Sequence, residues 1–449
     1  MNKKLRLVSC LGFVIFLIAA PSGPLSSLSA ESKTPAKDTV VDRKVEAIIA
    51  GLAPAFIEIR RDIHAHPELG YQEKRTSAIV AEYFRKLGLE VKTGIAGTGV
   101  LGILRAGKKG PVIGMRADMD ALPVTEETGL PFASKEKAVI DGREVGLMHA
   151  CGHDIHTAVL LGVAHVLSEI RNELAGTVLF VAQPAEESGS SGALKMLEEG
   201  LFQDLRPEAM FAFHVDDSIK AGFIKYTSGY MTANVDGFGL AIESKGCHGS
   251  QPWSCVDPIV VGAQVVTGLQ VMVAREINVR KDTVITVGTF HAGTASNVIP
   301  EKAELGATIR SYGEDERMLV KEKVERLVKN ICEAAGARFK LDYYIGIPSL
   351  YCDPHLLQRI LPTAIRVLGG KDRVIEEPPG MGGEDFSYFA REAPSVLLWL
   401  GIVPKDLEKT VSHSPSFVAD EESISVGVKV MSSIILDYLR GQTRRQPRL

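Results

Sequence analysis

Apolar positions in the first half of the chain alternate between helical spacing and short continuous runs. They recur every three to four residues over 41–63 and 76–87, which predicts two amphipathic helices. Continuous apolar runs, which indicate strands buried on both faces, occur at 112–115, 177–182 and 210–213. A further helical pattern at 156–173 lies between two of these runs. The alternation predicts an α/β fold, with a mixed, largely parallel sheet covered by helices.

The pattern changes near residue 230. From there to 344 the predicted strands alternate apolar and polar positions, and two long helical patterns, at 257–275 and 314–335, separate them. Two helices on a mostly antiparallel sheet form a small α+β, ferredoxin-like unit. Polar motifs resume beyond it. We therefore expect a split catalytic domain, 41–229 and 345–440, with residues 230–344 inserted as a lid or dimerisation domain.

The N-terminus has a composition of its own. Lys3, Lys4 and Arg6 precede an apolar run that ends at Ala20, and a Pro/Gly/Ser-rich stretch ends at Ala30. This order predicts a cleaved signal peptide over 1–30, a linker over 31–40 and export to the periplasm or the medium. The alternative is an uncleaved membrane anchor, although the run is shorter than the ~20 residues that span a bilayer. Gly, Pro or charge interrupts every later apolar run, so we expect no other membrane span. Residues 441–449 predict a disordered tail.

Composition excludes several classes of partner. The chain has 449 residues, 45% of them hydrophobic and 24% charged, with a formal net charge of -4. These values are typical of a globular protein. Because the net charge is small, the sequence does not predict binding to nucleic acid. Small molecules are the expected substrates. Without the leader the cysteines are five in number, and the sequence leaves open which of them pair: Cys151, Cys247, Cys255, Cys332 and Cys352.

The segment Met148–His156 holds one thiol, three imidazoles and a carboxylate within nine residues. Cys151 and His153 are two residues apart, which places their side chains on one side of an extended or tightly turned segment. Thiolate and imidazole are ligands of zinc and of other borderline divalent ions. The alternative is a buried thiol beside a hydrogen-bonded histidine. His156 begins the following helix and has packing as its simpler explanation.

Two adjacent carboxylates, Glu186 and Glu187, follow the strand at 177–182. Adjacent side chains point in different directions, so one can hold a metal while the other takes a proton from water. Asp118 follows another strand, and two interpretations are open: it orients a ligand histidine through a hydrogen bond, or it belongs to a salt-bridged loop. Single histidines at strand ends or in turns are weak signals alone. Together, the candidate ligands predict a two-metal hydrolase: Cys151, His153, Glu187, His214 and His413.

Six ordered motifs resemble the metal-dependent aminoacylase and carboxypeptidase family. Within it, they are most similar to the branch of hippurate hydrolases, plant auxin-conjugate hydrolases and N-acetyl-diaminopimelate deacetylases. The resemblance extends from Arg60-Arg61-Asp62-Ile63-His64-Ala65-His66-Pro67-Glu68-Leu69 to His413-Ser414-Pro415-Ser416-Phe417 and so covers nearly all of the mature chain. It implies that Cys151 is shared by two metals, that the other four candidates complete the ligand set, and that Glu186 is the general base and then the acid.

The resemblance also implies substrate contacts. His248, in Gly246-Cys247-His248-Gly249-Ser250, would reach an active site, often that of the partner subunit, and help to hold the oxyanion. Asn297 and Arg310 would contact the carbonyl and the carboxylate, and Glu384 would line the same cleft. The chain departs from many relatives at Cys247, where they have Gly, and at Trp253, where they have His. The departure at Trp253 weakens any transfer of substrate preference.

The expected reaction is hydrolysis of the amide bond of an N-acyl amino acid, such as a hippurate-like, N-acetyl or aryl-acetyl compound, by metal-activated water. The expected cofactors are two divalent ions, with Zn, Mn, Co and Ni all open, and the expected assembly is a homodimer. One rival is a metallo-di- or tripeptidase, or a carboxypeptidase, with the same dinuclear site. Another is a non-catalytic binding protein, which predicts the loss of a base or ligand, and none is missing.

Overall fold

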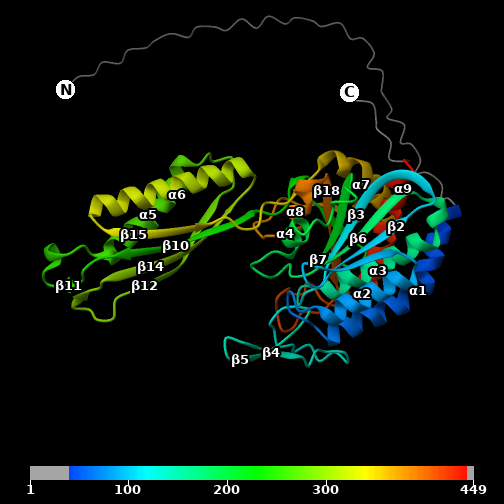
Figure 1. Ribbon diagram of the computed structural model, residues 1–449, viewed down its shortest axis with the longest axis horizontal. Coiled ribbons are helices and arrows are strands. Elements are labelled where there is room, and N and C mark those ends of the chain that lie inside the picture. Colours follow the sequence, from blue (N-terminus) through cyan, green and yellow to red (C-terminus); the bar gives the residue numbers. More distant parts are fainter. Residues whose placement is uncertain (1–39, 442–449) are drawn as a thin grey trace, which may run out of the picture. The chain divides into compact units, whose positions relative to one another are not determined.

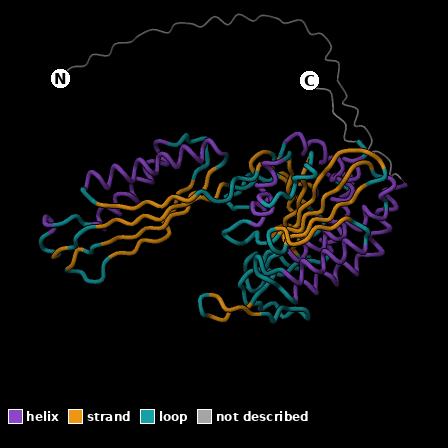
Figure 2. Tube along the Cα trace, in the orientation of Figure 1, coloured by secondary structure: helices purple, strands orange, loops and turns teal. Residues whose placement is uncertain are grey.

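The computed structural model describes residues 40–441. Apart from Val40 and Gly441, the predicted signal peptide, linker and tail lie outside the described residues. Two hydrophobic cores form in the described part, one around an eight-stranded sheet and one around a four-stranded sheet. We call these the large sheet and the small sheet (Figures 1 and 2).

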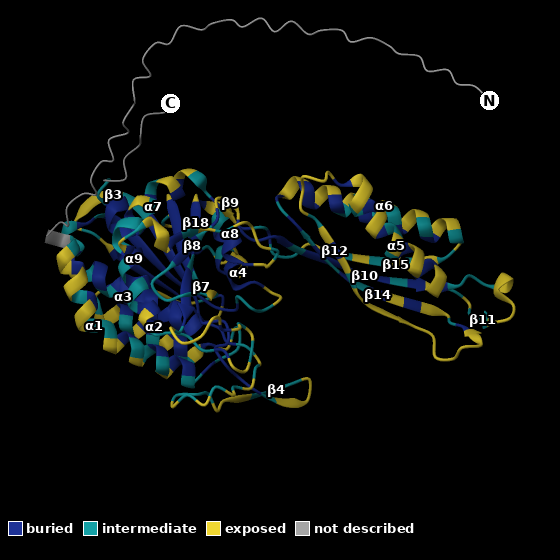
Figure 3. Cartoon of the chain, turned by 180° about the vertical axis from the view of Figure 1, so that it is seen from behind, coloured by how far each residue is buried: buried dark blue, intermediate teal, exposed yellow. Residues whose placement is uncertain are grey.

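The large sheet is mixed, with parallel strands at its centre. β6, β3, β7 and β18 are parallel to one another, and antiparallel pairings flank them through β2 on one side and β8 on the other. The strands, in spatial order, are β1 (Glu90–Ile95), β2 (Gly99–Arg105), β6 (Ala175–Gln183), β3 (Lys108–Asp118), β7 (Ala209–Lys220), β18 (Ser395–Val403), β8 (Ile224–Tyr226) and β17 (Val374–Glu376). The central strands are buried on both faces, which explains why their sequences lack polar alternation (Figure 3).

Helices cover the large sheet, as the alternation of elements predicts. α3 is buried almost all round because it packs between the sheet and both α1 and α9, and α2 packs on β1 and β2. The helices are α1 (Val40–Ala65), α2 (Lys74–Lys86), α3 (His153–Glu169), α4 (Gly192–Glu198), α7 (Pro354–Leu368), α8 (Phe386–Glu392) and α9 (Glu422–Leu439). Short 3-10 helices, η1 to η3, occur at Arg171–Glu173, Pro252–Ser254 and Lys371–Arg373.

The small sheet is antiparallel throughout, in the order β12-β14-β10-β15. Both of its helices lie on one face (Figure 1). In chain order the elements are β10 (Asn234–Glu243), α5 (Pro258–Glu276), β12 (Val284–Ala292), β14 (Lys302–Ser311), α6 (Glu314–Ala335) and β15 (Arg338–Tyr344). This β-α-β-β-α-β order with a central β10 and β14 is the ferredoxin-like arrangement.

Three short pairs of strands complete the fold. They are β4 (Lys137–Ile140) with β5 (Arg143–Gly146), β9 (Gly229–Tyr230) with β16 (Tyr351–Cys352), and β11 (Cys247–His248) with β13 (Val298–Ile299). The last pair belongs to the segment that carries two of the predicted substrate contacts.

The structure corrects two local expectations, the start of α3 and the end of β7, and adds an observation on α5. The helix predicted from His156 begins earlier, at His153, and ends at Glu169. β7 does not end before His214 but continues to Lys220, because β18 pairs with it through that stretch. α5 is, among the described residues, long and apolar enough to cross a membrane by length and composition, which the sequence reading did not anticipate. It packs on the small sheet, although much of its apolar surface is exposed.

Candidate metal centre

A glycine turn places Cys151 and His153 at the start of α3. Gly152, between them, has a φ of 78°, in the left-handed region that favours glycine. A Cβ there would also lie 2.7 Å from the side chain of Val215. The turn therefore needs glycine at this position. It joins a buried thiol to a buried imidazole at the carboxyl-end side of the parallel strands, where open α/β sheets bind ligands.

His153 and His214 both donate through Nδ1 to a backbone carbonyl, which leaves Nε2 of each ring as an acceptor. The Nδ1 of His153 donates to the carbonyl oxygen of Asp120 at 2.8 Å, and its buried Nε2 has no hydrogen-bond partner. The Nδ1 of His214 donates to the carbonyl oxygen of Val215 at 2.8 Å, and its Nε2 lies 3.4 Å from Sγ of Cys151. A histidine that binds a metal through one nitrogen usually donates its other N–H in this way. Both imidazoles fit a metal ligand.

Glu187 and His413 lie next to each other, although 226 positions separate them in the sequence. His413 Nε2 is 2.9 Å from Oε1 of Glu187. The backbone of His413 has a φ of 59°, which is uncommon for a residue other than glycine. Two hydrogen bonds hold this loop, from His413 N to the carbonyl of Ala150 and from Ser412 N to the carboxylate of Asp217, both at 2.8 Å. Unusual backbone conformations of this kind concentrate at functional sites.

The five predicted ligands form two overlapping groups that share Cys151. In each group the candidate ligand atoms lie within 4.8 Å of one another, and the groups are Cys151, His153, His214 and Cys151, Glu187, His413. Burial raises the pKa of the Cys151 thiol well above its usual value, so a thiolate there requires a cation. The donor set and the unpartnered Nε2 of His153 fit two divalent ions with a shared sulfur ligand.

His156 differs from these histidines because both of its ring nitrogens are already bonded. Its Nδ1 donates to Oδ1 of Asp118 at 2.6 Å, and its Nε2 accepts from the backbone N–H of Val215 at 2.9 Å. His156 therefore packs beside the site, which is the simpler explanation that the sequence offered. Asp118 accordingly hydrogen-bonds His156, and the predicted contact with a ligand histidine is longer, 3.8 Å to Nε2 of His153.

Glu186 lies beside a buried acidic pair. An oxygen of its carboxylate is within 4.8 Å of those of Glu384 and Asp385. Burial and the charges of these two neighbours raise the pKa of Glu186 well above its usual value. Arg116, itself buried, holds the pair in place at 3.0 Å and 2.9 Å respectively. Glu384 is thus engaged with Arg116 next to Glu186, and its predicted contact with substrate stays a prediction.

Sequence reasoning missed Asp120. Its two carboxylate oxygens accept the backbone N–H groups of Glu186 and Glu187, each at 3.0 Å, and its carbonyl oxygen holds His153. The only signal was its place in the run Arg116-Ala117-Asp118-Met119-Asp120 after a buried strand. Arg116 was missed for the same reason, since nothing local distinguishes a buried arginine.

His248 and Asn297 lie together on the small-sheet part of the chain. The backbone N–H of Gly249 donates to the carbonyl oxygen of Asn297 at 2.8 Å, and β11 pairs with β13 beside them. The Nδ1 of His248 accepts from the backbone N–H of Ser250 at 3.1 Å. In the neutral ring the proton is therefore on Nε2, which is free to donate.

The cysteine pairing that the sequence left open is resolved in the structure. A disulfide joins Cys247 to Cys255 and closes the loop that carries His248 and the exposed Trp253. Cys332 and Cys352 are free and buried, as is Cys151.

Arg310 lies on the small sheet, away from His248, which lies on the separate β11-β13 pair. It pairs with Val235 near the C-terminal end of β14, whereas β11 and β13 lie beyond the N-terminal end of that strand, at Lys302. Within residues 40–441, no hydrogen bond or ion pair links His248, Asn297 or Arg310 to the five candidate ligands. The structure therefore assembles the ligands and Glu186, but not the predicted substrate contacts.

Comparisons with known proteins identify the family of this chain. The sequence pattern of Peptidase family M20/M25/M40 matches residues 114–437. A thermostable carboxypeptidase of Saccharolobus solfataricus is 37% identical over 83% of this chain and 92% of its own. An N-acetylcysteine deacetylase of Bacillus subtilis is 36% identical over 86% of this chain and 97% of its own.

A solved structure has the same fold. The YXEP protein of Bacillus subtilis, described as a dinuclear metal binding peptidase of the M20 family, superposes with a TM-score of 0.74 and 33% identity over 87% of this chain and 99% of its own. The family that the ordered motifs resemble is confirmed by these matches. The chain belongs to peptidase family M20/M25/M40 and is a hydrolase of amide bonds.

Proposed function

We propose that this protein hydrolyses the amide bond of N-acyl amino acids with two divalent metal ions. The observation that carries the proposal is the pair of ligand groups that share Cys151, with the Glu186 carboxylate beside them. Cys151, His153 and His214 would hold one ion, and Cys151, Glu187 and His413 the other. Two ions held there would polarise the scissile carbonyl and lower the pKa of a coordinated water.

Glu186 then moves the proton. Its carboxylate takes a proton from the attacking water and passes it to the leaving nitrogen, which leaves as the free amino group. The Nε2–H of His248 donates a hydrogen bond to the carbonyl oxygen as negative charge develops on it, with Asn297 beside it. Arg310 meets the α-carboxylate of the substrate, where a guanidinium can bind both oxygens.

The positions of His248 and Arg310 support a homodimer. The run of β14 from Lys302 to Arg310 spans roughly 26 Å at about 3.3 Å per residue. An N-acyl amino acid is much shorter than this. If both side chains contact one substrate, they come from different chains. We therefore propose that His248 acts in the active site of the partner subunit.

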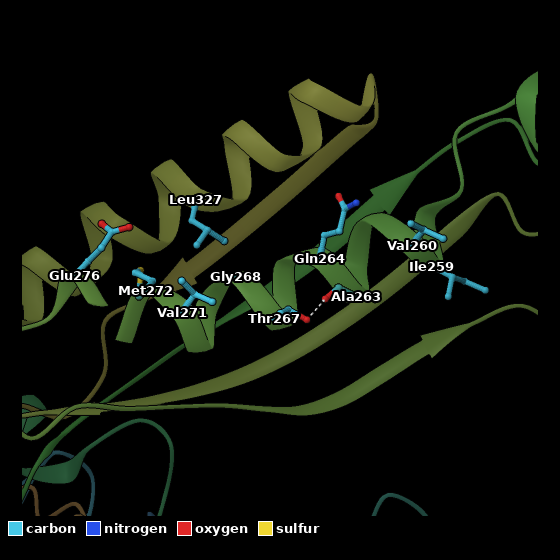
Figure 4. Close-up of a pocket in the computed structure, with 10 residues that line it drawn as sticks. All are labelled: Ile259, Val260, Ala263, Gln264, Thr267, Gly268, Val271, Met272, Glu276 and Leu327. Carbon is cyan, nitrogen blue, oxygen red and sulfur yellow. Dashed lines mark hydrogen bonds between the residues drawn. The ribbon is translucent and has the colours of Figure 1, made fainter. Parts of the chain in front are cut away.

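The surface of the small sheet supports the same assembly. β12 is an edge strand, mostly exposed, and it carries no Lys, Arg, Asp or Glu to discourage pairing with another strand. Beside it, α5 exposes Ile259, Val260 and Val271, which line a groove of about 610 Å³ that reaches Leu327 on α6 (Figure 4). A second copy of this chain would cover both features. Light scattering that gives the mass of one chain would refute it.

The disulfide supports export. Disulfides such as Cys247–Cys255 form and persist in oxidising compartments, and the predicted signal peptide would direct the chain to one. We propose a periplasmic or secreted location with the leader removed. Fractionation of the producing cells, with mass determination of the mature chain, tests both parts of this proposal.

A peptidase is the second candidate, because the carboxypeptidase relative is as similar as the deacetylase. Purified protein, loaded in turn with Zn, Mn, Co or Ni, should be assayed on N-acetyl-leucine and hippurate and, in parallel, on Gly-Leu. Faster turnover of the acyl amino acids supports the proposal, and faster turnover of the dipeptide overturns it. Metal analysis of protein purified without chelators identifies the resident ions.

A further inference from the structure

The segment from Glu68 to Glu73, between α1 and α2, has no part in the proposed mechanism. It nevertheless contacts the two loops of the site, one with Asp120 and one with Glu186. The carbonyl oxygen of Glu68 accepts the backbone N–H of Ala121, next to Asp120, at 2.8 Å. A Cβ on Gly70 would lie 3.0 Å from Cβ of Ala185, so the segment presses closely on the residue before Glu186.

Glu73 holds that residue directly. Its side chain has no solvent exposure. One carboxylate oxygen accepts the backbone N–H of Ala185 at 2.8 Å, and the other accepts the hydroxyl of Thr98 at 2.6 Å. Ala185 has a φ of 54°, in the left-handed region that alanine rarely adopts. A conformation of this kind persists only where its surroundings hold it.

Three consecutive backbone N–H groups are therefore bound by two buried carboxylates. Ala185 donates to Glu73, and Glu186 and Glu187 donate to Asp120. β6 has ended at Gln183, so none of the three has a partner in the sheet. The direction in which the Glu186 side chain leaves the backbone follows from the conformation of the residue before it.

We propose that Glu73 is a positioning residue, which holds Ala185 in its left-handed conformation and thereby aims the carboxylate of Glu186. The inference rests on the proposed function in one respect, the role of Glu186 as the base. Glu73 touches none of the five candidate metal ligands, so its effect is on geometry and not on metal loading.

The test uses the full-length, metal-loaded protein with four variants. Glu73→Ala removes the acceptor, and Glu73→Asp keeps the charge but shortens its reach. Glu73→Gln keeps an oxygen for Ala185 and an NH2 group for Thr98. Glu82→Ala is the matched control, because Glu82 lies exposed on α2, the helix that follows Glu73, and forms an ion pair with Lys86.

We expect the Ala and Asp variants to lose at least about tenfold in kcat while KM changes less than about twofold, because the base and not the binding surface is displaced. Their metal content should equal that of the wild type. The Gln variant and the control should stay within about threefold of the wild-type kcat. If the Ala variant does not fold, the Asp variant carries the test.

Hydrogen exchange of the peptide over 183–191 gives a readout that needs no substrate. It should become faster in the Ala and Asp variants, and not in the Gln variant or the control. Unchanged exchange, or an unchanged kcat despite faster exchange, overturns the proposal, as does a Gln variant that loses as much as the Ala variant. A wild type that hydrolyses no N-acyl amino acid contradicts the proposed function, and exchange still decides whether Glu73 holds Ala185.

Discussion

One carboxylate oxygen of Asp120 accepts the backbone N–H of Glu186 at 3.0 Å, and the other accepts the backbone N–H of Glu187. The candidate base and a candidate metal ligand are thus oriented by one side chain. The carbonyl oxygen of Asp120 also holds His153, so the same residue organises both sides of the site.

Asp120→Asn should lower kcat by roughly ten- to a hundredfold, since its NH2 group would face one of the two N–H donors in place of an acceptor. Steady-state kinetics with metal in excess measures the effect. Asp204→Asn is the matched control, because Asp204 is exposed and forms an ion pair with Lys92. Wild-type kcat in the Asp120 variant would contradict the orienting role.

Glu186→Gln should abolish turnover without removing the metals. The amide cannot take a proton from water, and the loss of a general base costs roughly a hundred- to ten-thousandfold in rate. Metal analysis and kinetics on the same sample separate the two effects. Glu198→Gln, at an exposed position on α4, should behave as the wild type. Normal activity in the Glu186 variant would refute its assignment.

Cys151→Ser should reduce metal content as well as rate. Its sulfur belongs to both ligand groups, and a serine hydroxyl is a weaker ligand for zinc-like ions than a thiolate. The number of ions per chain after dialysis is the measurement. Cys332→Ala, in the core of the small sheet, is the control for loss of a buried thiol. Full metal content in the Cys151 variant would exclude a shared sulfur ligand.

Mixing His248→Ala with Glu186→Gln should restore activity that neither variant has alone. In a dimer with exchanged histidines, one site of each mixed dimer contains Glu186 from one chain and His248 from the other. Random exchange of subunits then recovers roughly a quarter of the wild-type rate. The assay follows activity after the two inactive proteins are mixed and equilibrated. No recovery, with exchange shown by mass spectrometry, would place His248 in its own chain's site.

Glu73 should make the stability of the fold depend on pH. Burial raises the pKa of Glu73 to about 7, above the value near 4.5 expected in the unfolded chain. A raised carboxyl pKa stabilises the fold at low pH, and that stability is lost as pH rises from about 4.5 through 7. Across this pH range, the contribution of Glu73 to the free energy of unfolding falls by about 3 kcal/mol.

Glu73→Gln should remove this dependence, so the variant gains stability relative to the wild type between pH 5 and pH 8. Urea unfolding of both proteins at each pH, with the same metal concentration, gives the difference in their free energies of unfolding. The contributions of other titrating groups are the same in both proteins and cancel in this difference. If the free energies of unfolding of the two proteins differ by the same amount at pH 5 and at pH 8, the raised pKa is contradicted.

Local patterns were enough to predict the architecture. Continuous apolar runs marked the central strands, because parallel strands are buried on both faces, and helical spacing marked the helices around them. Cys151, His153, Glu187, His214 and His413 were recognisable because thiol, imidazole and carboxylate groups at strand ends and turns are unusual unless something binds them. Boundaries were less certain: His214 was placed at the end of a strand that continues to Lys220 through its pairing with β18.

Only the tertiary structure decided which polar groups meet. His153 and His156 are the same residue type three positions apart, yet one leaves Nε2 free and the other has both nitrogens bonded, through contacts with Asp120, Asp118 and Val215. Hydrogen-bond partners of this kind come from strands brought together by the sheet, so no local pattern encodes them. For the same reason Asp120 and Glu73, which hold the backbone around Glu186, became visible only in the fold.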